Sequence, residues 1–165
     1  CDRLEKTTAV GHGAPRLIIM GRVIAIGDYQ LISLIDRCGA EVVAELLDEG
    51  VRASEKDVEL EGDLLLNFAR NRYLDKTPID IFQPAWHARM RRLKELIDEY
   101  RADGVIWYQL AYDEIYDMEY TCVANELKEL GVPLLRLETN YSYTREELSL
   151  VKTQIESFVG RLCRD

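Results

Sequence analysis

Residues 107–116, WYQLAYDEIY, place two carboxylates, Asp113 and Glu114, directly after Tyr112 and just before Tyr116. The first half of this stretch is typical of a buried strand and the second half of a helix, so the acids lie at a strand–helix junction. There they can serve as general acids or bases beside Tyr112, or ligate a metal through oxygen. The competing explanation is structural, because carboxylates at a helix start complement free amides and the helix dipole. Spacing alone favours the structural explanation.

The same helix start is crowded with further carboxylates and tyrosines. Asp117 and Glu119 follow the acid pair, and Tyr112, Tyr116 and Tyr120 recur at helical spacing. Side chains with that spacing share one helix face. We therefore expect most of the three tyrosines to be packing residues.

A second concentration of charge is basic. Arg89, Arg91, Arg92 and Lys94 stand close together in an otherwise acidic chain. Such a run is usually a solvated helix face, and the alternative is a patch for an acidic partner or for the phosphates of a large substrate. We expect the solvated face.

The sequence lacks the residue patterns that other common active sites require. A nucleotide site needs a glycine-rich turn after the first strand, and GRVIAIGD offers only Gly21 and Gly27 with bulky residues between them. A serine hydrolase would need a nucleophile elbow, which the sequence lacks. The two histidines, His12 and His87, belong to no cluster with metal-ligand spacing.

The elements that position these residues follow from the apolar pattern. Apolar runs predict strands at 16–21, 40–47, 104–109 and 134–139. Helical periodicity predicts helices over about 28–38, 63–75, 86–102, 116–130 and 144–162. Asp28 is the expected N-cap of the first helix, and Thr144 and Glu147 form a capping box at the last one.

Strands that are apolar throughout are covered by helices on both faces, and right-handed crossovers make them parallel. The predicted fold class is α/β, a three-layer doubly wound domain with a four-stranded parallel sheet, flavodoxin- or Rossmann-like. Functional sites in such folds lie beyond the carboxyl ends of the strands. Those ends are residues 21–22, 47–48, 110–114 and 138–143.

Composition limits the partners. The 165 residues carry a formal charge of −9, which excludes nucleic acid and anionic membrane as main partners because both need a basic surface. No apolar run approaches the ~20 residues of a membrane span. The four cysteines are widely spaced, which favours the cytoplasm. Cys38 and Cys122 fall on apolar helix faces, where we expect buried thiols.

The length fits one domain. We expect a flexible lead segment at 1–14 and a single α/β domain at 15–163. The chain starts at Cys1 rather than Met, which indicates a fragment of a longer protein.

The order of segments from about Pro15 to Leu162 resembles a known family. Its opening strand–helix–strand resembles PRLIIMGRVIAIGDYQLISLIDRCGAEVVAELLDEGVR, and its arginine-tyrosine-leucine segment with a following proline resembles FARNRYLDKTPID. The next strand and helix are similar to LIDEYRADGVIWYQLAYDEIYDMEY, and the last ones to ELKELGVPLLRLETNYS and LVKTQIESFVGRL. Together the pieces resemble the C-terminal domain of a subunit of the 2-hydroxyacyl-CoA dehydratase and benzoyl-CoA reductase family.

That resemblance implies two related subunits, each carrying a [4Fe–4S] cluster held by cysteines. An ATP-driven activator protein would supply one electron, and radical chemistry would remove water from a 2-hydroxyacyl-CoA or reduce an aromatic thioester. The implied partners are a related cluster-bearing subunit, the activator and an acyl-CoA substrate.

The family's two cluster cysteines in this region are replaced. Ile79 stands near the first position, after Pro78, and Asp113 stands at the second, with Glu114 in place of the acid that follows. Thiolates are the standard cluster ligands, so this domain cannot build an ordinary all-cysteine cluster. Asp113 remains a metal or cofactor ligand through oxygen, a harder donor than sulfur.

Three hypotheses follow. The first is a dehydratase- or reductase-like subunit with altered or lost cluster ligation, in which Tyr112, Asp113 and Glu114 are catalytic. The second is a non-catalytic scaffold or partner domain that keeps the fold without a cluster. The third is an unrelated flavodoxin-like binding module, for which the flavin-phosphate loop is not visible.

Overall fold

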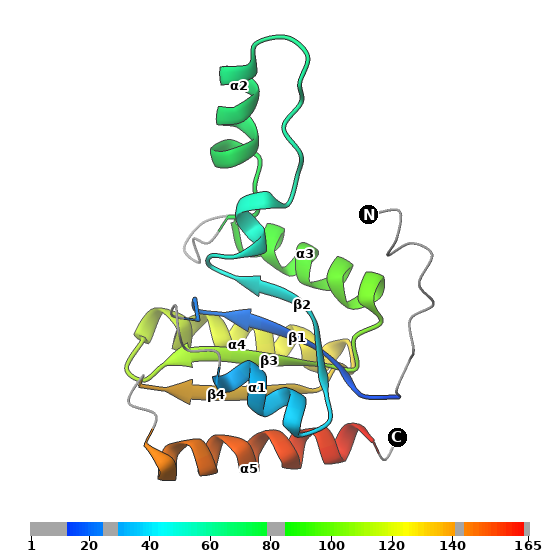
Figure 1. Ribbon diagram of the computed structural model, residues 1–165, viewed down its shortest axis with the longest axis vertical. Coiled ribbons are helices and arrows are strands. Elements are labelled where there is room, and N and C mark those ends of the chain that lie inside the picture. The colour runs from blue at the N-terminus through cyan, green and yellow to red at the C-terminus, as the bar shows by residue number, and fades with distance from the viewer. Residues whose placement is uncertain (1–12, 25–29, 79–84, 141–143, 164–165) are drawn as a thin grey trace.

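The computed structural model describes residues 13–24, 30–78, 85–140 and 144–163 (Figure 1). Its sheet contains the four strands β1 (Arg16–Gly21), β2 (Glu41–Leu47), β3 (Gly104–Leu110) and β4 (Leu134–Thr139). All neighbours pair in parallel, in the order β2-β1-β3-β4. The chain runs outward from β1 to β2 and then crosses back to β3, so the winding reverses between β1 and β3. This is the predicted doubly wound fold with a flavodoxin-like strand order.

Five α-helices accompany the sheet in the described part of the chain: α1 (Gln30–Arg37), α2 (Leu64–Ala69), α3 (Ala85–Tyr100), α4 (Glu114–Glu129) and α5 (Arg145–Leu162). A 3-10 turn, Val51–Ser54, follows β2, and a π-helical segment, Arg70–Leu74, continues α2. The predicted helices are confirmed with shifts at their ends. None of these helices is long and apolar enough to cross a bilayer.

The sheet is the middle of three layers. Alternate residues of the central strands feed a core shared with α1 and α5, whose buried members include Leu17, Ile19, Ile35, Ile106, Tyr108 and Phe158. The intervening residues feed a core shared with α3 and α4, whose members include Ile18, Met20, Leu93, Val105, Trp107 and Val123. Burial on both faces is the reason why β1 and β3 carry apolar side chains at nearly every position.

The helix ends follow local sequence signals where these are described. The capping box at α5 is present, since Thr144 and Glu147 satisfy each other's backbone amides. The predicted N-cap Asp28 lies outside the described residues, as do Ile79 and the first twelve residues of the predicted lead segment.

Some single side chains differ from the sequence-based expectation. Arg89 is 2% exposed and pairs with Glu119 instead of facing solvent. Cys122 is exposed on α4, one position away from the buried Val123, whereas Cys38 is partly buried against the α1–α5 core. The prediction of a buried thiol is therefore wrong for Cys122. A residue beside the apolar stripe of a helix turns about 100° away from it and can face water.

Two of the three tyrosines near the start of α4 are packing residues, as predicted. Tyr116 is buried and Tyr120 is partly buried, and both pack against Trp107 with ring centroids 5.9 and 6.0 Å apart. Tyr112 is 97% exposed, because it precedes α4 and does not share its buried face.

Candidate functional site

Polar side chains from three strands meet beyond the carboxyl ends of β1, β2 and β3. Arg22 follows β1, Asp48 follows β2 and Asp113 follows β3. The Arg22 Nη1 atom lies 3.4 Å from Oδ2 of Asp48, and its Nε atom lies 3.8 Å from Oδ2 of Asp113. Arg22 thus lies where the winding reverses between β1 and β3, the usual position of ligands in open α/β sheets.

Gly21 sets the position of Arg22. Its φ is 122°, and a Cβ at this residue would lie 2.2 Å from the carbonyl oxygen of Tyr108. The amide of Arg22 donates to that same oxygen at 2.8 Å. Because only glycine tolerates both the conformation and the contact, the first strand ends close against the third.

Tyr116 completes what we call the switch-point cluster, namely Arg22, Asp48, Asp113 and Tyr116. The Tyr116 hydroxyl donates a short hydrogen bond to Oδ2 of Asp48, and its ring centroid lies 5.5 Å from the Arg22 guanidinium. Burial, together with the adjacent Asp48 carboxylate, raises the pKa of Tyr116 far above its ordinary value. The phenol therefore stays protonated at neutral pH and acts as a donor.

The switch-point cluster contains two buried polar atoms that have no hydrogen-bond partner among the described residues. They are Nε of Arg22 and Oδ1 of Asp48. Buried polar atoms in folded proteins are nearly always hydrogen-bonded, so such atoms need a partner such as a ligand or water. One atom offers a donor and the other an acceptor, and the Arg22 side chain is 42% exposed.

A buried ion pair joins α3 to α4 next to the cluster. Nη1 of Arg89 lies 2.6 Å from Oε1 of Glu119, and both side chains are at most 2% exposed. Burial raises the pKa of Glu119 to about 7, against the opposing effect of Arg89, and the negative charge of Asp48 adds to the rise. The site therefore borders a carboxyl group that changes charge near neutral pH.

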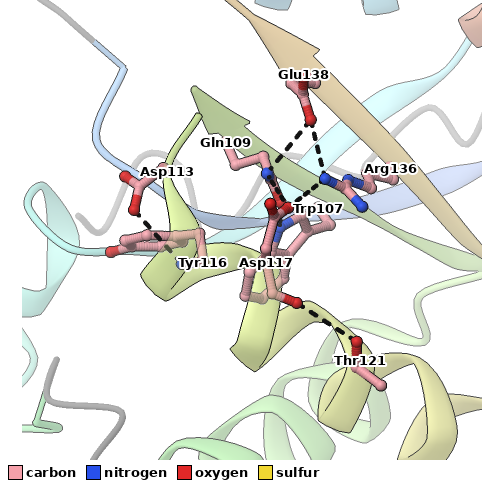
Figure 2. A network of polar contacts seen from close by, with 8 residues as sticks. All are labelled: Trp107, Gln109, Asp113, Tyr116, Asp117, Thr121, Arg136 and Glu138. Atoms are coloured by element: carbon pink, nitrogen blue, oxygen red, sulfur yellow. Dashed lines mark hydrogen bonds and ion pairs between the residues drawn. The ribbon is translucent and has the colours of Figure 1, made fainter. Parts of the chain in front are cut away.

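A second polar network lies toward β4 (Figure 2). Buried Gln109 accepts from Nε1 of Trp107 at 2.7 Å and donates to Oδ1 of Asp117 at 2.8 Å. Arg136 of β4 pairs with Asp117 and, at 2.9 Å, with Glu138. Since each of these charges has an opposite charge beside it, the network braces β3, β4 and α4 together.

Of the three predicted site residues at the start of α4, only Asp113 faces the switch-point cluster. Asp113 is the N-cap of α4 and accepts from the amide of Tyr116 at 3.4 Å, as the structural explanation predicted, and it also faces Arg22. Glu114 is exposed in the first turn. Tyr112 has a φ of 64°, an uncommon and strained conformation for a bulky residue. Such strain is concentrated at functional sites.

Arg22 and Asp48 were not predicted as site residues. The strand-end rule pointed to residues 21–22 and 47–48, but no sequence pattern pairs them with Tyr116. Their contact depends on the parallel pairing of β1 with β2, which brings Gly21 opposite Leu47.

The residues that the structure describes do not fit a cysteine-held cluster at the strand ends. Cys38 follows α1, Cys122 lies within α4 and Cys163 ends α5, so none stands at a strand end, and all three are free thiols. Within the described ranges, no three His, Cys, Asp or Glu side chains gather as a metal-binding group. Asp113, the metal candidate, faces the Arg22 cation, which opposes binding of a metal ion at the same carboxylate.

A family model described as 2-hydroxyglutaryl-CoA dehydratase, D-component, matches residues 1–162. The chain belongs to this family. It is also similar to the putative dehydratase subunit YjiM of Escherichia coli (strain K12), with 25% identity over 154 residues. That match covers 90% of this chain and 38% of the relative, so the chain spans well under half of the relative's length. The resemblance seen in the order of segments is confirmed.

Proposed function

We propose that this chain acts as the C-terminal domain of a subunit of a 2-hydroxyacyl-CoA dehydratase-like enzyme, with the switch-point cluster orienting the reacting end of the substrate. The observation that carries this proposal is that two buried atoms of the cluster make no hydrogen bond within the described residues, the donor Nε of Arg22 and the acceptor Oδ1 of Asp48. A 2-hydroxyacyl thioester offers a carbonyl that accepts and a hydroxyl that donates. The membership of a dehydratase family supports the same substrate class.

Within this proposal Asp113 acts as the general acid or base. Its side chain is 18% exposed, enough for a substrate proton to reach it, and its Oδ2 lies 3.8 Å from Nε of Arg22. Tyr112 and Glu114 flank it at the rim, where their exposed side chains contact the acyl group. Tyr116 and Asp48 hold Arg22 in position from below.

We place the family's [4Fe–4S] cluster on a related partner subunit, because Cys38, Cys122 and Cys163, the cysteines that the structure describes, do not stand at the strand ends. An ATP-driven activator supplies the electron to that subunit. The free thiols of this chain agree with a cytoplasmic location.

The decisive experiment replaces Asp113 by Asn in the assembled enzyme and follows dehydration of a 2-hydroxyacyl-CoA under anaerobic conditions. Asn caps a helix as well as Asp does but carries no charge and transfers no proton. We expect turnover to fall on the order of 100-fold, with the thermal midpoint nearly unchanged. Asp63→Asn is the matched control, since Asp63 is the N-cap of the remote α2. Unchanged turnover in Asp113→Asn would refute the catalytic role.

A non-catalytic scaffold is the second candidate, and one observation favours it. Asp113 already serves as the cap of α4 and the ion-pair partner of Arg22, so its position has a purely structural explanation. Iron and acid-labile sulfide analysis of the chain after anaerobic purification tests the placement of the cluster. We expect neither on this chain, and about four irons per chain would contradict both versions of the proposal.

A further inference from the structure

Two buried carboxyl groups, those of Asp48 and Glu119, lie at the inner side of the switch-point cluster. Asp48 follows β2 and is 6% exposed, and Glu119 of α4 is 3% exposed. Within the described residues, neither Oδ1 of Asp48 nor Oε2 of Glu119 makes a hydrogen bond. Buried polar atoms in folded proteins are nearly always hydrogen-bonded, so both oxygens call for a further bound molecule.

The two carboxyl groups are neighbours. Tyr116 and Glu119 are three residues apart on α4, so their buried side chains leave the same side of the helix. The Tyr116 hydroxyl donates to Oδ2 of Asp48, which places Asp48 at that side as well. The negative charge of Asp48 also helps to raise the pKa of Glu119, an influence that weakens with distance. A small molecule between the two groups can therefore contact both.

The charged and titratable groups around Glu119 come from several elements. Arg89 of α3 pairs with its Oε1 at 2.6 Å, and Asp48 acts on it from the end of β2. Tyr116 lies one turn earlier on α4, and Arg22 contacts both Tyr116 and Asp48. Burial outweighs the pairing with Arg89 and brings the pKa of Glu119 to about 7. A proton is thus available on Glu119 at neutral pH.

One water molecule satisfies both oxygens. A protonated Glu119 donates to the water, and the water donates to Oδ1 of Asp48. Buried waters commonly bridge polar groups that have no other partner in this way. Oδ1 has a second lone pair, which remains for the hydroxyl of the substrate. The hydrogen bonds then form one chain from Glu119 through the water and Asp48 to the substrate.

We propose that Glu119 supplies the proton with which the substrate hydroxyl leaves as water, acting through one bridging water and Asp48. This inference rests on the proposed function, which brings the substrate hydroxyl to Oδ1 of Asp48. Glu119 gives its proton to the bridging water, and that water gives another to Oδ1. Asp48 then protonates the hydroxyl oxygen, and the C–O bond breaks with its electron pair on that oxygen.

The protons balance over one turnover. The hydrogen that the substrate loses from carbon passes as a proton to Asp113, whose side chain is 18% exposed and releases it to solvent. After the product leaves, a proton from solvent returns to Glu119 along the same chain of hydrogen bonds. Loss of water from a substrate is redox-neutral overall, so the chain of hydrogen bonds carries protons alone.

The first test is made on the chain without substrate or partner. Carbon-13 NMR of the side-chain carboxyl groups follows the titration of Glu119, with Glu119→Gln for the assignment. We expect a midpoint near pH 7 that moves to lower pH in Asp48→Asn, because the neighbouring negative charge is gone. Glu126→Gln is the matched control. Glu126 also pairs across α3 and α4, with Lys94 at 2.9 Å, but its side chain is 38% exposed.

A crystal structure of the wild-type chain locates the water without any substitution. We expect a water oxygen roughly 2.5–3.0 Å from Oδ1 of Asp48 and from a carboxyl oxygen of Glu119. A Glu119 midpoint that Asp48→Asn leaves unchanged overturns the proposal. A direct contact between the two carboxyl groups, or a protein partner at Oδ1, overturns it as well.

The second test measures kcat and KM against pH in the assembled enzyme, with the substrate used for Asp113→Asn. The wild-type kcat should fall as the pH rises through about 7, by up to about tenfold per pH unit, because ionised Glu119 has no proton to give. Glu119→Gln should lose this dependence and lower kcat on the order of 100-fold, with KM little changed. The amide keeps the shape of the side chain but supplies no proton. Glu126→Gln should follow the wild type.

The outcomes separate this inference from the proposed function. A wild-type kcat that does not fall through pH 7, or a Glu119→Gln variant with full turnover, overturns the proton supply while a loss of turnover in Asp113→Asn still stands. Full turnover in Asp113→Asn refutes the role of Asp113, whatever the titration of Glu119 shows. A purely structural role of Glu119 would lower stability in Glu119→Gln without changing the pH dependence of kcat.

Discussion

Arg89 and Glu119 form an ion pair 2.6 Å apart in which both side chains are almost completely shielded from water. The pair ties α3 to α4 directly beside the switch-point cluster, and the charge of Asp48 acts on it. Removing charges from water costs several kcal/mol, so such a pair adds little net stability. Removing only one of its partners, however, strongly destabilises the fold. Its consequences can be measured in the isolated chain.

Glu119→Ala should destabilise the chain by about 3–5 kcal/mol, because it leaves the Arg89 charge buried without its counter-ion. Replacing both residues at once, by Arg89→Met and Glu119→Leu, should restore much or all of that loss. Urea unfolding of the three variants measures both effects. A double variant as unstable as Glu119→Ala would contradict this account of the pair.

The stability of the chain should depend on pH through Glu119. Its pKa is about 7 in the folded chain and 4.5 ordinarily, so the folded state holds the proton more tightly. The resulting stabilisation is fully present below pH 4.5 and is lost as the pH rises through 7, by up to about 1.4 kcal/mol per unit. Glu119→Gln should lack this slope. The unfolding free energy of the wild type minus that of the variant should therefore fall as the pH rises from 4.5 through 7. Parallel pH curves for the two proteins would count against the shift.

Tyr116→Phe should cost about 1.5–3 kcal/mol, because the Asp48 carboxylate loses the hydrogen bond that the Tyr116 hydroxyl donates, while the ring contact with Trp107 remains. Tyr120→Phe, at the neighbouring partly buried tyrosine, should change the unfolding free energy by no more than about 0.5 kcal/mol. Absorbance titration gives a second measurement. The tyrosine missing from the Tyr116→Phe curve should be one that ionises above the ordinary range.

Gly21→Ala should be severely destabilising. The new Cβ meets the Tyr108 carbonyl oxygen at 2.2 Å in addition to an unfavourable φ, so β1 and β3 must separate. Gly39→Ala is the matched control, since its φ is +81° with no atom within 4 Å, and it should cost only about 1–2 kcal/mol. The difference in thermal midpoint between the two variants measures the cost of the clash with the Tyr108 carbonyl oxygen, because both variants share an unfavourable φ.

Tyr112→Gly should preserve or slightly raise stability, because glycine relieves a φ of 64° and the lost side chain is 97% exposed. The relief of about 1–2 kcal/mol outweighs the entropic cost of glycine of roughly 0.5–1 kcal/mol. If Tyr112 contacts substrate as proposed, turnover of the assembled enzyme falls in the same variant. A loss of stability would mean that the left-handed conformation carries no strain.

Much of the fold could be predicted because its signals are local. The apolar runs of β1 and β3 require cover on both faces, and the capping box at Thr144 marks the start of α5. The strand-end rule also located the site region. Arg89 was placed wrongly because periodicity does not show which buried position contains an opposite charge, here Glu119 on another helix. The helix at 63–75 was predicted, but the exposure of all its residues to solvent was not.

The sequence by itself determined that four parallel strands alternate with helices, that Asp113 begins a helix, and that no cysteine follows a strand. These properties depend on neighbours along the chain. Only the tertiary structure decided that Arg22, Asp48 and Tyr116 meet at one point, that Glu119 titrates near neutral pH, and that the leucines of α2 are exposed to solvent. Those depend on strand order, burial and helix orientation, which join residues far apart in the sequence.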